Sequence, residues 1–388
     1  MGFFIPHSTL KNLKEYKYQG EDRSIVSRYL LKPFWYKFVQ IFPLWMAPNV
    51  VTLLGFCFIL VNLLTVFYFD PYLLSDQPRW TYFSYAFGLF MYQTFDACDG
   101  THARRTGQSG PLGELFDHCV DAVNTTLSVI IFSSVAGFGY SWLLIASQFG
   151  TLANFYLSTW EEYHTHKLFL SEFSGPVEGI LSVVGLFTIT GIFGPQIWQT
   201  EFFEANLSFL GLDSDFKFTF TTAYIIFGVI GLYFNIESAR RNVQDHYKND
   251  SKSYFKALKG LSPFFIYYAT VFAWLKYNPI IIEKYCLPFV LTVGLTLAFS
   301  VGRIIIGHLT LQKFPLLTPS IFIPLAEFLI FKLLTLMGYS SDSITGDLIW
   351  TGFGLSLGFY SLFVLEIIYE ITTYLDIYAL SIKHPKSS

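Results

Sequence analysis

Apolar segments, each about as long as a membrane is thick, recur along almost the whole chain with short polar connections between them. A helix that spans a membrane needs about 20 mostly apolar residues. Ten segments meet that requirement, so the pattern predicts an all-α, polytopic membrane protein. The predicted spans are 50–69, 82–103, 113–137, 140–160, 177–196, 218–237, 262–277, 284–307, 318–338 and 347–372.

Basic residues gather in alternate connections between the predicted spans. Lys and Arg precede the first span, follow spans two, six and eight, and reappear at the C-terminus, whereas the connections after odd spans are acidic or mixed. Connections rich in Lys and Arg stay in the cytosol. The pattern therefore predicts cytosolic termini, a cytosolic segment 240–259 and a lumenal connection 197–216. It also places the ends of spans two and three together, on the cytosolic side.

The composition supports a membrane protein and excludes several other classes. Of the 388 residues, 53% are hydrophobic and only 14% are charged, against about 25% charged in soluble domains. The net charge of −3 leaves no basic surface for nucleic acid, so we expect no nucleic-acid partner. The four cysteines show no CxxC pairing, which favours buried thiols over disulfides or a zinc site.

The segment 29–46, before the first span, mixes Trp, Phe, Tyr and Lys, which is typical of an amphipathic helix lying on lipid headgroups. Plain anchoring and the gating of lipid entry both fit this pattern. The chain then divides into a cytosolic N-terminal segment with this interfacial helix (1–46), a six-helix transmembrane bundle (47–240), a cytosolic connection (241–261), a four-helix transmembrane region (262–375) and a cytosolic tail (376–388).

Four aspartates interrupt the apolar pattern where spans two and three adjoin. A helix turns by 100° per residue, so a first group of polar and small residues falls within an arc of about 140° around one helix. A second group falls within an arc of about 80° around the next helix. Gly107, Gly110 and Pro111 break the helix between them. Two adjacent helices are therefore expected to present four carboxylates to each other. The groups are Asp96, Asp99, Gly100, Ala103 and Arg104, followed by Gly113, Asp117 and Asp121.

Four neighbouring carboxylates at a membrane surface repel one another unless cations lie between them. Oxygen ligands favour hard cations, so we expect Mg²⁺ or Mn²⁺. Metal-binding carboxylates beside an arginine and small residues suit a pyrophosphate group. The alternative is a buried ion network neutralised by Arg104 and Arg105, but two positive charges do not balance four negative ones.

The pattern DxxDGxxARx₈GxxxDxxxD over 96–121 matches the signature of the CDP-alcohol phosphotransferase class-I family without a departure. The flanking sequences PLWMAPNVVTLLGF (43–56), STWEEYHTHKL (158–168) and SGPVEGI (174–180) resemble the eukaryotic choline and ethanolamine phosphotransferases. The likeness is strongest to the fungal diacylglycerol cholinephosphotransferases and extends nearly to the C-terminus.

This resemblance implies that a diacylglycerol hydroxyl attacks the β-phosphorus of CDP-choline, giving phosphatidylcholine and CMP. It also implies two Mg²⁺ ions, or Mn²⁺, and an active site that faces the cytosol in the endoplasmic reticulum membrane, with the Golgi as the alternative; a homodimer is allowed. The implied metal ligands are Asp96, Asp99, Asp117 and Asp121. The implied CDP-alcohol contacts are Asn49, Asp99, Gly100, Ala103, Arg104 and Gly113. Asn49 is also suited to cap the first span.

His118 and Asp121 are the two candidates for the base that removes the hydroxyl proton. A carboxylate that binds metal is a poor base, and histidine titrates closer to neutrality, so we favour His118 over a merely hydrogen-bonding histidine. Glu178 stands among apolar residues and glycines. It is suited either to orient His118 or simply to be stabilised by the helix dipole, because it lies at the N-terminus of its own helix. Acidic and histidine residues at the end of span four are expected at the surface or the substrate rim: Glu161, Glu162, His164 and His166.

Three other functions would fit parts of the same sequence pattern. An ethanolaminephosphotransferase, or a dual enzyme, shares every motif. A cation-coupled transporter is disfavoured because the sequence shows no inverted repeat and its carboxylates cluster at one membrane face. A lipid-handling scaffold without catalysis is disfavoured because all positions of the motif are intact.

Overall fold

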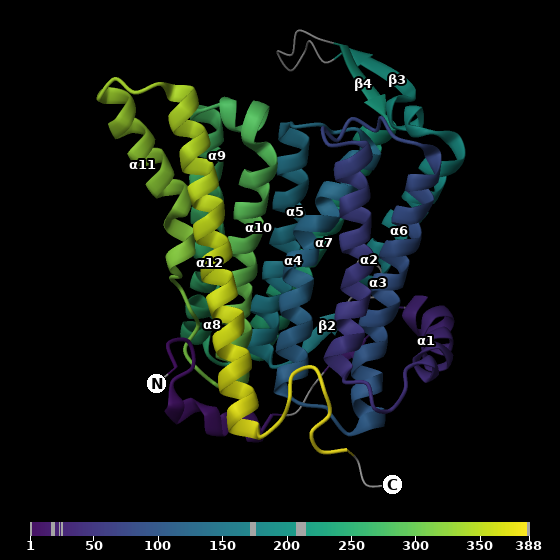
Figure 1. Cartoon of the computed structure of the whole chain (residues 1–388), viewed down its shortest axis with the longest axis vertical. Coiled ribbons are helices and arrows are strands. Elements are labelled where there is room, and N and C mark those ends of the chain that lie inside the picture. The colour runs from purple at the N-terminus through teal and green to yellow at the C-terminus, as the bar shows by residue number, and fades with distance from the viewer. Residues whose placement is uncertain are drawn as a thin grey trace.

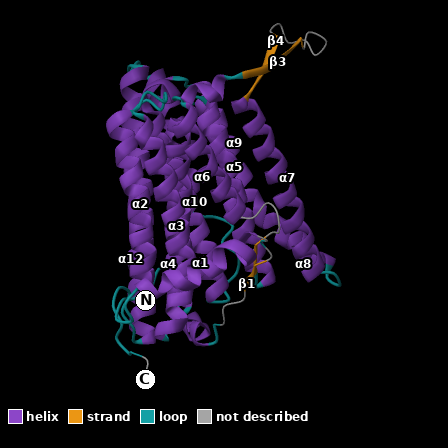
Figure 2. Cartoon of the chain, turned by 90° about the vertical axis from the view of Figure 1, so that its right-hand side faces the viewer, coloured by secondary structure: helices purple, strands orange, loops and turns teal. Residues whose placement is uncertain are grey.

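The computed structural model describes residues 2–16, 20–22, 24, 26–170, 176–206 and 215–385. Within these ranges the chain forms a bundle of long helices that run side by side, with two small sheets at its margins (Figures 1 and 2). The helices are α1 Lys32–Phe38, α2 Pro48–Phe69, α3 Arg79–Thr106, α4 Pro111–Ala136, α5 Trp142–Thr165, α6 Pro176–Phe193, α7 Phe220–His246, α8 Ser251–Leu258, α9 Ser262–Tyr277, α10 Ile280–Leu309, α11 Ile323–Leu336 and α12 Ser341–Leu375.

Each of the ten predicted spans coincides with one of these helices, from α2 to α7 and from α9 to α12. Six helical stretches among the described residues are long and apolar enough to cross a membrane, so the chain is a multi-pass membrane protein. These stretches are Pro48–Phe69, Pro111–Ala136, Phe220–His246, Ile280–Leu309, Pro319–Leu336 and Ser341–Leu375.

The predicted helix break between the two groups of aspartates is confirmed. α3 ends at Gly107, whose φ of 71° lies in the left-handed region that glycine adopts without strain. Pro111 then occupies the first position of α4, where its missing N–H costs no hydrogen bond. The chain reverses within these few residues, so the C-terminal part of α3 and the N-terminal part of α4 meet at the lower end of the bundle in Figure 1.

α10 lies at the centre of the bundle and packs against α4, α5 and α12. Two glycines let neighbouring side chains come very close to its backbone. A Cβ on Gly294 would lie 2.3 Å from Oγ1 of Thr126 in α4, and a Cβ on Gly302 would lie 2.5 Å from the Phe363 ring of α12. α10 therefore joins the two halves of the bundle through contacts that only glycine permits.

Both chain termini return to the end of the bundle where α3 meets α4 (Figure 1). The 3₁₀ helix His7–Lys14 lies there, and Asn12 donates a hydrogen bond of 2.8 Å to the Thr310 carbonyl after α10. The C-terminal tail folds back so that Asn49, near the start of α2, and Gln108, in the α3–α4 turn, donate to the carbonyls of Ala379 and His384. Segments far apart in sequence thus cover this end of the bundle.

The structure corrects the all-α prediction in two connections. β1 Gly20–Asp22 pairs in parallel with β2 Leu168–Leu170. β3 Glu201–Asn206, in the predicted lumenal connection, pairs antiparallel with β4 Asp215–Thr219, which extends into the start of the predicted span 218–237. The Phe202 and Phe218 rings and the Lys217–Glu201 ion pair of 2.7 Å hold the two strands of the hairpin together. Such cross-strand pairs are not visible from hydropathy alone.

The predicted interfacial helix over 29–46 is shorter than expected. Residues Ser27–Leu31 form a π-helical turn, α1 covers Lys32–Phe38, and Val39–Ile41 form a 3₁₀ turn. α1 lies beside the lower part of α3, outside the main bundle (Figure 1). The sequence also did not predict α8. This helix lies in the connection after span six, and the Asp250 side chain caps its first turn.

Candidate active site

Three of the four predicted metal-binding aspartates come together in the structure. Asp96 and Asp99 of α3 and Asp117 of α4 each place a carboxylate oxygen within 4.8 Å of the other two. All three side chains are half-buried where the two helices meet. The one-turn spacing within α3 and the tight Gly107–Pro111 reversal bring them to one place, as the motif predicts.

Only some of the carboxylate oxygen atoms in this cluster accept a hydrogen bond from the described residues. The hydroxyl of Thr52 in α2 donates to Oδ2 of Asp99. Asp117 Oδ1 is buried and accepts no hydrogen bond from the described residues. A buried carboxylate oxygen without a donor is unfavourable unless a cation lies against it. The three carboxylates therefore fit the hard divalent ion that the sequence predicts.

Asp121 follows Asp117 by one turn of α4 and is not part of this three-residue group. Its Oδ1 accepts a hydrogen bond from the hydroxyl of Tyr92 in α3. The structure thus brings Asp121 to the α3–α4 interface, where Tyr92 is its donor as Thr52 is the donor of Asp99.

Neither arginine of the motif neutralises the aspartates. Arg104 is exposed and donates to the Thr101 hydroxyl at 2.9 Å, and Arg105 donates to the Val39 carbonyl before α2. Among the described residues, no ion pair joins either guanidinium group to an aspartate. The alternative of a self-contained ion network is therefore not what the structure shows, and the excess negative charge stays at the cluster.

Two motif glycines border open space beside the cluster. A Cβ on Gly100 would find only the Arg104 guanidinium within 4 Å, at 3.8 Å, and a Cβ on Gly113 would find only Asn49 Oδ1, at 4.0 Å. Ala103, on the same helix, is buried. Of the predicted CDP-alcohol contacts, Gly100 thus lies close to Arg104, and Gly113 lies close to Asn49.

Asn49 does not cap α2, so that prediction is wrong. The helix begins at Pro48 after Ala47, and no side chain caps it. Asn49 is buried and donates from Nδ2 to the Ala379 carbonyl at 2.9 Å, which leaves Oδ1 near Gly113. A proline at the first helical position removes one free N–H group, and the Asn49 amide donates to the C-terminal tail instead of accepting from the first turn of α2.

His118 is buried on α4, beside the aspartates. Its Nδ1 lies 2.9 Å from the Glu114 carbonyl and 4.0 Å from Oδ2 of Asp117. A carbonyl only accepts hydrogen bonds, so Nδ1 donates to it. Nε2 lies 3.4 Å from Oε2 of Glu162 in α5.

Glu162 is therefore the carboxylate that faces Nε2 of His118, although the sequence predicted it at the surface or the substrate rim. Glu161, Glu162 and His164 are all buried, which corrects that prediction, whereas His166 is exposed as expected. Glu161 accepts a hydrogen bond from Asn242 of α7, and α7 together with the 310–318 connection covers this side of α5. Desolvation by neighbouring side chains lowers the pKa of His166, which follows α5, below its usual range.

Glu178 lies elsewhere. Its Oε1 accepts a hydrogen bond from the Ser24 hydroxyl, which ties the start of α6 to the N-terminal segment. No contact with His118 is found for it among the described residues. Sequence reasoning offered Glu178 as the residue that orients His118, but the carboxylate found beside His118 Nε2 is Glu162 of α5.

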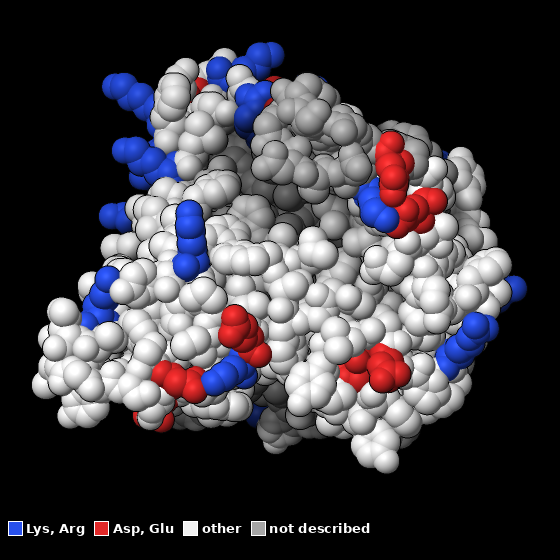
Figure 3. Space-filling view, turned by 90° about the horizontal axis from the view of Figure 1, so that it is seen from above, with Lys and Arg blue, Asp and Glu red and all other residues white. Residues whose placement is uncertain are grey.

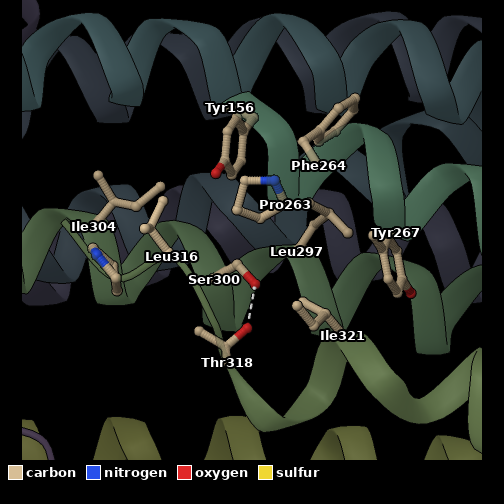
Figure 4. A pocket seen from close by; sticks show the side chains of 11 residues that line it. Tyr156, Pro263, Phe264, Tyr267, Leu297, Ser300, Ile304, Leu316, Thr318 and Ile321 are labelled. Atoms are coloured by element: carbon tan, nitrogen blue, oxygen red, sulfur yellow. Dashed lines mark hydrogen bonds between the residues drawn. The ribbon is translucent and has the colours of Figure 1, made fainter. Parts of the chain in front are cut away.

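A cavity between α5, α9, α10 and the 315–321 segment provides a contrast (Figure 4). Its walls are mainly apolar, and the polar contact within it is a 3.1 Å hydrogen bond between the hydroxyls of Ser300 and Thr318. Among the described residues, no carboxylate, histidine or basic side chain lines it. The aspartates and His118 lie instead near the α3–α4 end of the bundle.

Comparison with known proteins agrees with this site. The model of the CDP-alcohol phosphatidyltransferase family matches residues 45–204, which include the aspartates and His118. Over the full length of both chains, the protein is 54% identical to choline/ethanolaminephosphotransferase 1 and 52% identical to cholinephosphotransferase 1, both of Saccharomyces cerevisiae. The chain belongs to the CDP-alcohol phosphatidyltransferase family.

The similarity reaches beyond fungi. Choline/ethanolaminephosphotransferase 2 of Arabidopsis thaliana is 36% identical, and that alignment covers 98% of this chain and 99% of the plant protein. The family model ends before α7, whereas these relatives match the whole chain, so the C-terminal helices belong to the same type of protein.

Sequence reasoning gave no role at the site to Thr52 or Tyr92, and it placed Glu162 at the surface or the substrate rim rather than beside His118. Tyr92 lies one helical turn before Asp96, so its position on the motif face of α3 was a usable signal. Thr52 and Glu162 belong to helices outside the motif, and no local pattern relates them to it. Their roles depend on how α2 and α5 pack against the α3–α4 pair.

Proposed function

We propose that this protein transfers phosphocholine from CDP-choline to diacylglycerol, releasing phosphatidylcholine and CMP. The observation that carries the proposal is the half-buried cluster of Asp96, Asp99 and Asp117 inside a complete family motif. Open space at Gly100 and Gly113 lies beside it, with Arg104 at its edge. That combination suits a nucleoside diphosphate bound through metal ions and a guanidinium group.

The aspartates would hold two Mg²⁺ ions, or Mn²⁺, with Asp121 as the fourth ligand residue. Such ions neutralise the diphosphate and stabilise the CMP leaving group. The protein's own contribution is to hold the carboxylates in place: Thr52 orients Asp99, and Tyr92 orients Asp121. Asn49, Gly100, Ala103, Arg104 and Gly113 would contact the nucleotide.

His118 is proposed to remove the proton of the diacylglycerol hydroxyl. With Nδ1 fixed by the Glu114 carbonyl, Nε2 is available as the base. Glu162, 3.4 Å from Nε2, would stabilise the imidazolium that forms and so acts as a positioning residue. This arrangement replaces Glu178 in the role that sequence reasoning left open for it.

The positioning role can be tested by comparing two glutamates. Glu162→Gln should lower kcat more than Glu178→Gln, with KM for CDP-choline changed little in either variant. A displacement of the acid fall of kcat to lower pH in Glu162→Gln would show that the histidine, rather than the fold, has been affected, because an imidazolium without its neighbouring carboxylate loses its proton more easily. Equal losses in the two variants would contradict a special role for Glu162.

We further propose ten membrane spans, with both termini and the active site on the cytosolic side of the endoplasmic reticulum membrane. The opposite end of the bundle, seen in Figure 3, carries scattered charges of both signs on a mostly uncharged surface, as a lumenal face does under the positive-inside rule. Glycosylation acceptors inserted at position 205 should be modified, and those at position 250 should not. The reverse pattern would contradict this topology.

Purified protein supplied with diacylglycerol and either CDP-choline or CDP-ethanolamine tests the reaction directly. We expect CMP release and phosphatidylcholine formation that depend on Mg²⁺ or Mn²⁺. Ethanolamine is the specific second candidate, because a relative that is 54% identical is a choline/ethanolaminephosphotransferase. A higher kcat/KM for CDP-ethanolamine would reassign the head group, and cation transport without CMP release would reject the enzyme altogether.

A further inference from the structure

A second group of ionisable side chains lies apart from the aspartate cluster. Glu114 of α4, Glu162 of α5 and His308 of α10 each place one potential ligand atom within 4.8 Å of the other two. We call these three residues the Glu–His cluster. Oε1 of Glu114 lies 4.0 Å from Nε2 of His308, which is too far for a hydrogen bond. The atoms are therefore close together without being bonded to one another.

The Glu114 carboxylate is the strongest sign that a ligand belongs in this cluster. Its side chain is only 5% exposed, and while Oε2 accepts a hydrogen bond from the Tyr16 hydroxyl, the buried Oε1 has no hydrogen-bond donor among the described residues. A buried carboxylate oxygen without a donor is costly, and a bound cation removes that cost.

His308 is oriented as a metal-binding histidine usually is. Its ring stacks on that of His166 with centroids 5.0 Å apart, and the two Nδ1 atoms lie 3.1 Å from each other, so one ring donates and the other accepts. Nε2 of His308 is thereby directed at Glu114. Metal-binding histidines typically use their second nitrogen in such a hydrogen bond, which fixes the ring.

We propose that Glu114, Glu162 and His308 bind one Zn²⁺ ion, and that bound Zn²⁺ draws Glu162 away from His118 and slows phosphocholine transfer. One imidazole and two carboxylates form a mixed nitrogen and oxygen set that suits zinc, whereas Mg²⁺ prefers oxygen alone. In a tetrahedral zinc site the ligand atoms lie roughly 3.3 Å apart, slightly closer than the present 4.0 Å. The inhibitory half of the proposal rests on the proposed function, in which Glu162 orients His118.

Zinc binding is tested without any activity assay. The full-length protein, purified in detergent with millimolar Mg²⁺ to saturate the aspartates, is titrated with Zn²⁺ against a chromogenic chelator. The wild type should bind one Zn²⁺, and His308→Ala and Glu114→Gln should each weaken binding by at least about 10-fold, because each removes a ligand. Asp117→Asn, with an altered aspartate cluster, should bind Zn²⁺ as the wild type does. Unchanged affinity in both His308→Ala and Glu114→Gln would overturn the site.

Inhibition is tested in the same preparations. Zn²⁺ at micromolar concentration should lower the wild-type rate, and His308→Ala should need at least about 10-fold more Zn²⁺ for the same inhibition. The rate of His308→Ala without Zn²⁺ should stay near that of the wild type. Equal inhibition of both proteins would show that Zn²⁺ acts by displacing Mg²⁺ from the aspartates and would overturn the regulatory half. If no transferase activity is found at all, the proposed function fails while the binding titration still decides the zinc site.

Discussion

Glycine serves opposite purposes in two regions of this bundle. In α10, Cβ atoms on Gly294 and Gly302 would lie only 2.3 and 2.5 Å from side chains of α4 and α12, so glycine is there to let helices approach. In α3 and α4, Cβ atoms on Gly100 and Gly113 would meet nothing closer than 3.8 Å. The first pair closes the interior of the protein, and the second leaves unfilled space beside the aspartates, where the proposed nucleotide would bind. Local spacing of glycines along the chain does not distinguish the two uses.

Carboxyl groups differ between the aspartate cluster and the C-terminal helices. Glu327 of α11 stands alone and accepts a 3.0 Å hydrogen bond at Oε2 from Nε1 of Trp274. Its buried Oε1 lies close to the Gly352 backbone of α12 and has no donor among the described residues. An isolated carboxyl in the interior can avoid the cost of its charge by binding a proton. Asp96, Asp99 and Asp117 lie together and repel one another, so cations are the natural partners of that cluster. Burial alone therefore does not mark a catalytic carboxylate.

The largest effect is expected from the aspartates. Asp99→Asn or Asp117→Asn should lower transfer at least about 10³-fold, because each removes a negative charge that holds metal at the diphosphate. Thermal stability should be unchanged or higher, since mutual repulsion is reduced. Activity and melting temperature measured on the same preparation check this. Glu327→Gln, which also replaces a carboxyl by an amide but among the C-terminal helices, is the control. Near-normal activity with unchanged metal dependence in the aspartate variants would refute the proposed metal site.

His118→Ala should lower kcat by about 10²–10⁴-fold, the usual contribution of a general base. KM for CDP-choline should change little, because His118 faces Glu162 rather than the opening at Gly100. Steady-state kinetics on the purified variant measure both constants. His246→Ala, at the exposed end of α7, is the matched control. A His118→Ala protein that keeps more than about a tenth of the wild-type kcat would leave Asp121 as the base.

Leucine substitutions should separate the two kinds of glycine. Gly302→Leu forces a side chain into the Phe363 ring and should reduce stability by about 1–3 kcal/mol or more, with a lower melting temperature. Gly100→Leu fills open space and should raise KM for CDP-choline by about 10-fold, equivalent to about 1.4 kcal/mol of lost binding, while the melting temperature is kept. A lower melting temperature in Gly100→Leu, together with a raised KM and an unchanged melting temperature in Gly302→Leu, would contradict this distinction between the glycines.

The smallest effect is expected from Glu327→Gln. The substitution keeps the shape of the side chain and the acceptor for Trp274, and it removes only the ability to ionise in the interior. Stability should therefore be unchanged or slightly raised, and kcat should stay within about twofold of the wild type. Thermal unfolding and a transfer assay measure these two quantities. A loss of activity comparable with that of the aspartate variants would give the C-terminal helices a direct part in the reaction.

Most of the helices and the centre of the site were determined by the sequence itself. Every predicted span coincides with a helix, because a run of about 20 apolar residues has few stable structures other than a helix in a membrane. Gly107 and Pro111 ended α3 and started α4 as predicted, through backbone preferences that act within a few residues. The spacing of Asp96, Asp99 and Asp117 then brought three carboxylates to one interface.

Tertiary structure alone decided which distant residues complete the site. Glu162 reaches His118 because α5 packs against α4, Asn49 bonds to the Ala379 carbonyl because the C-terminal tail folds back, and Glu178 is held by Ser24 instead of meeting His118. Each of these contacts joins segments that are far apart in the chain. Helix periodicity specifies which face of a helix is polar, but the partner of that face depends on how the helices pack, and no local pattern encodes it.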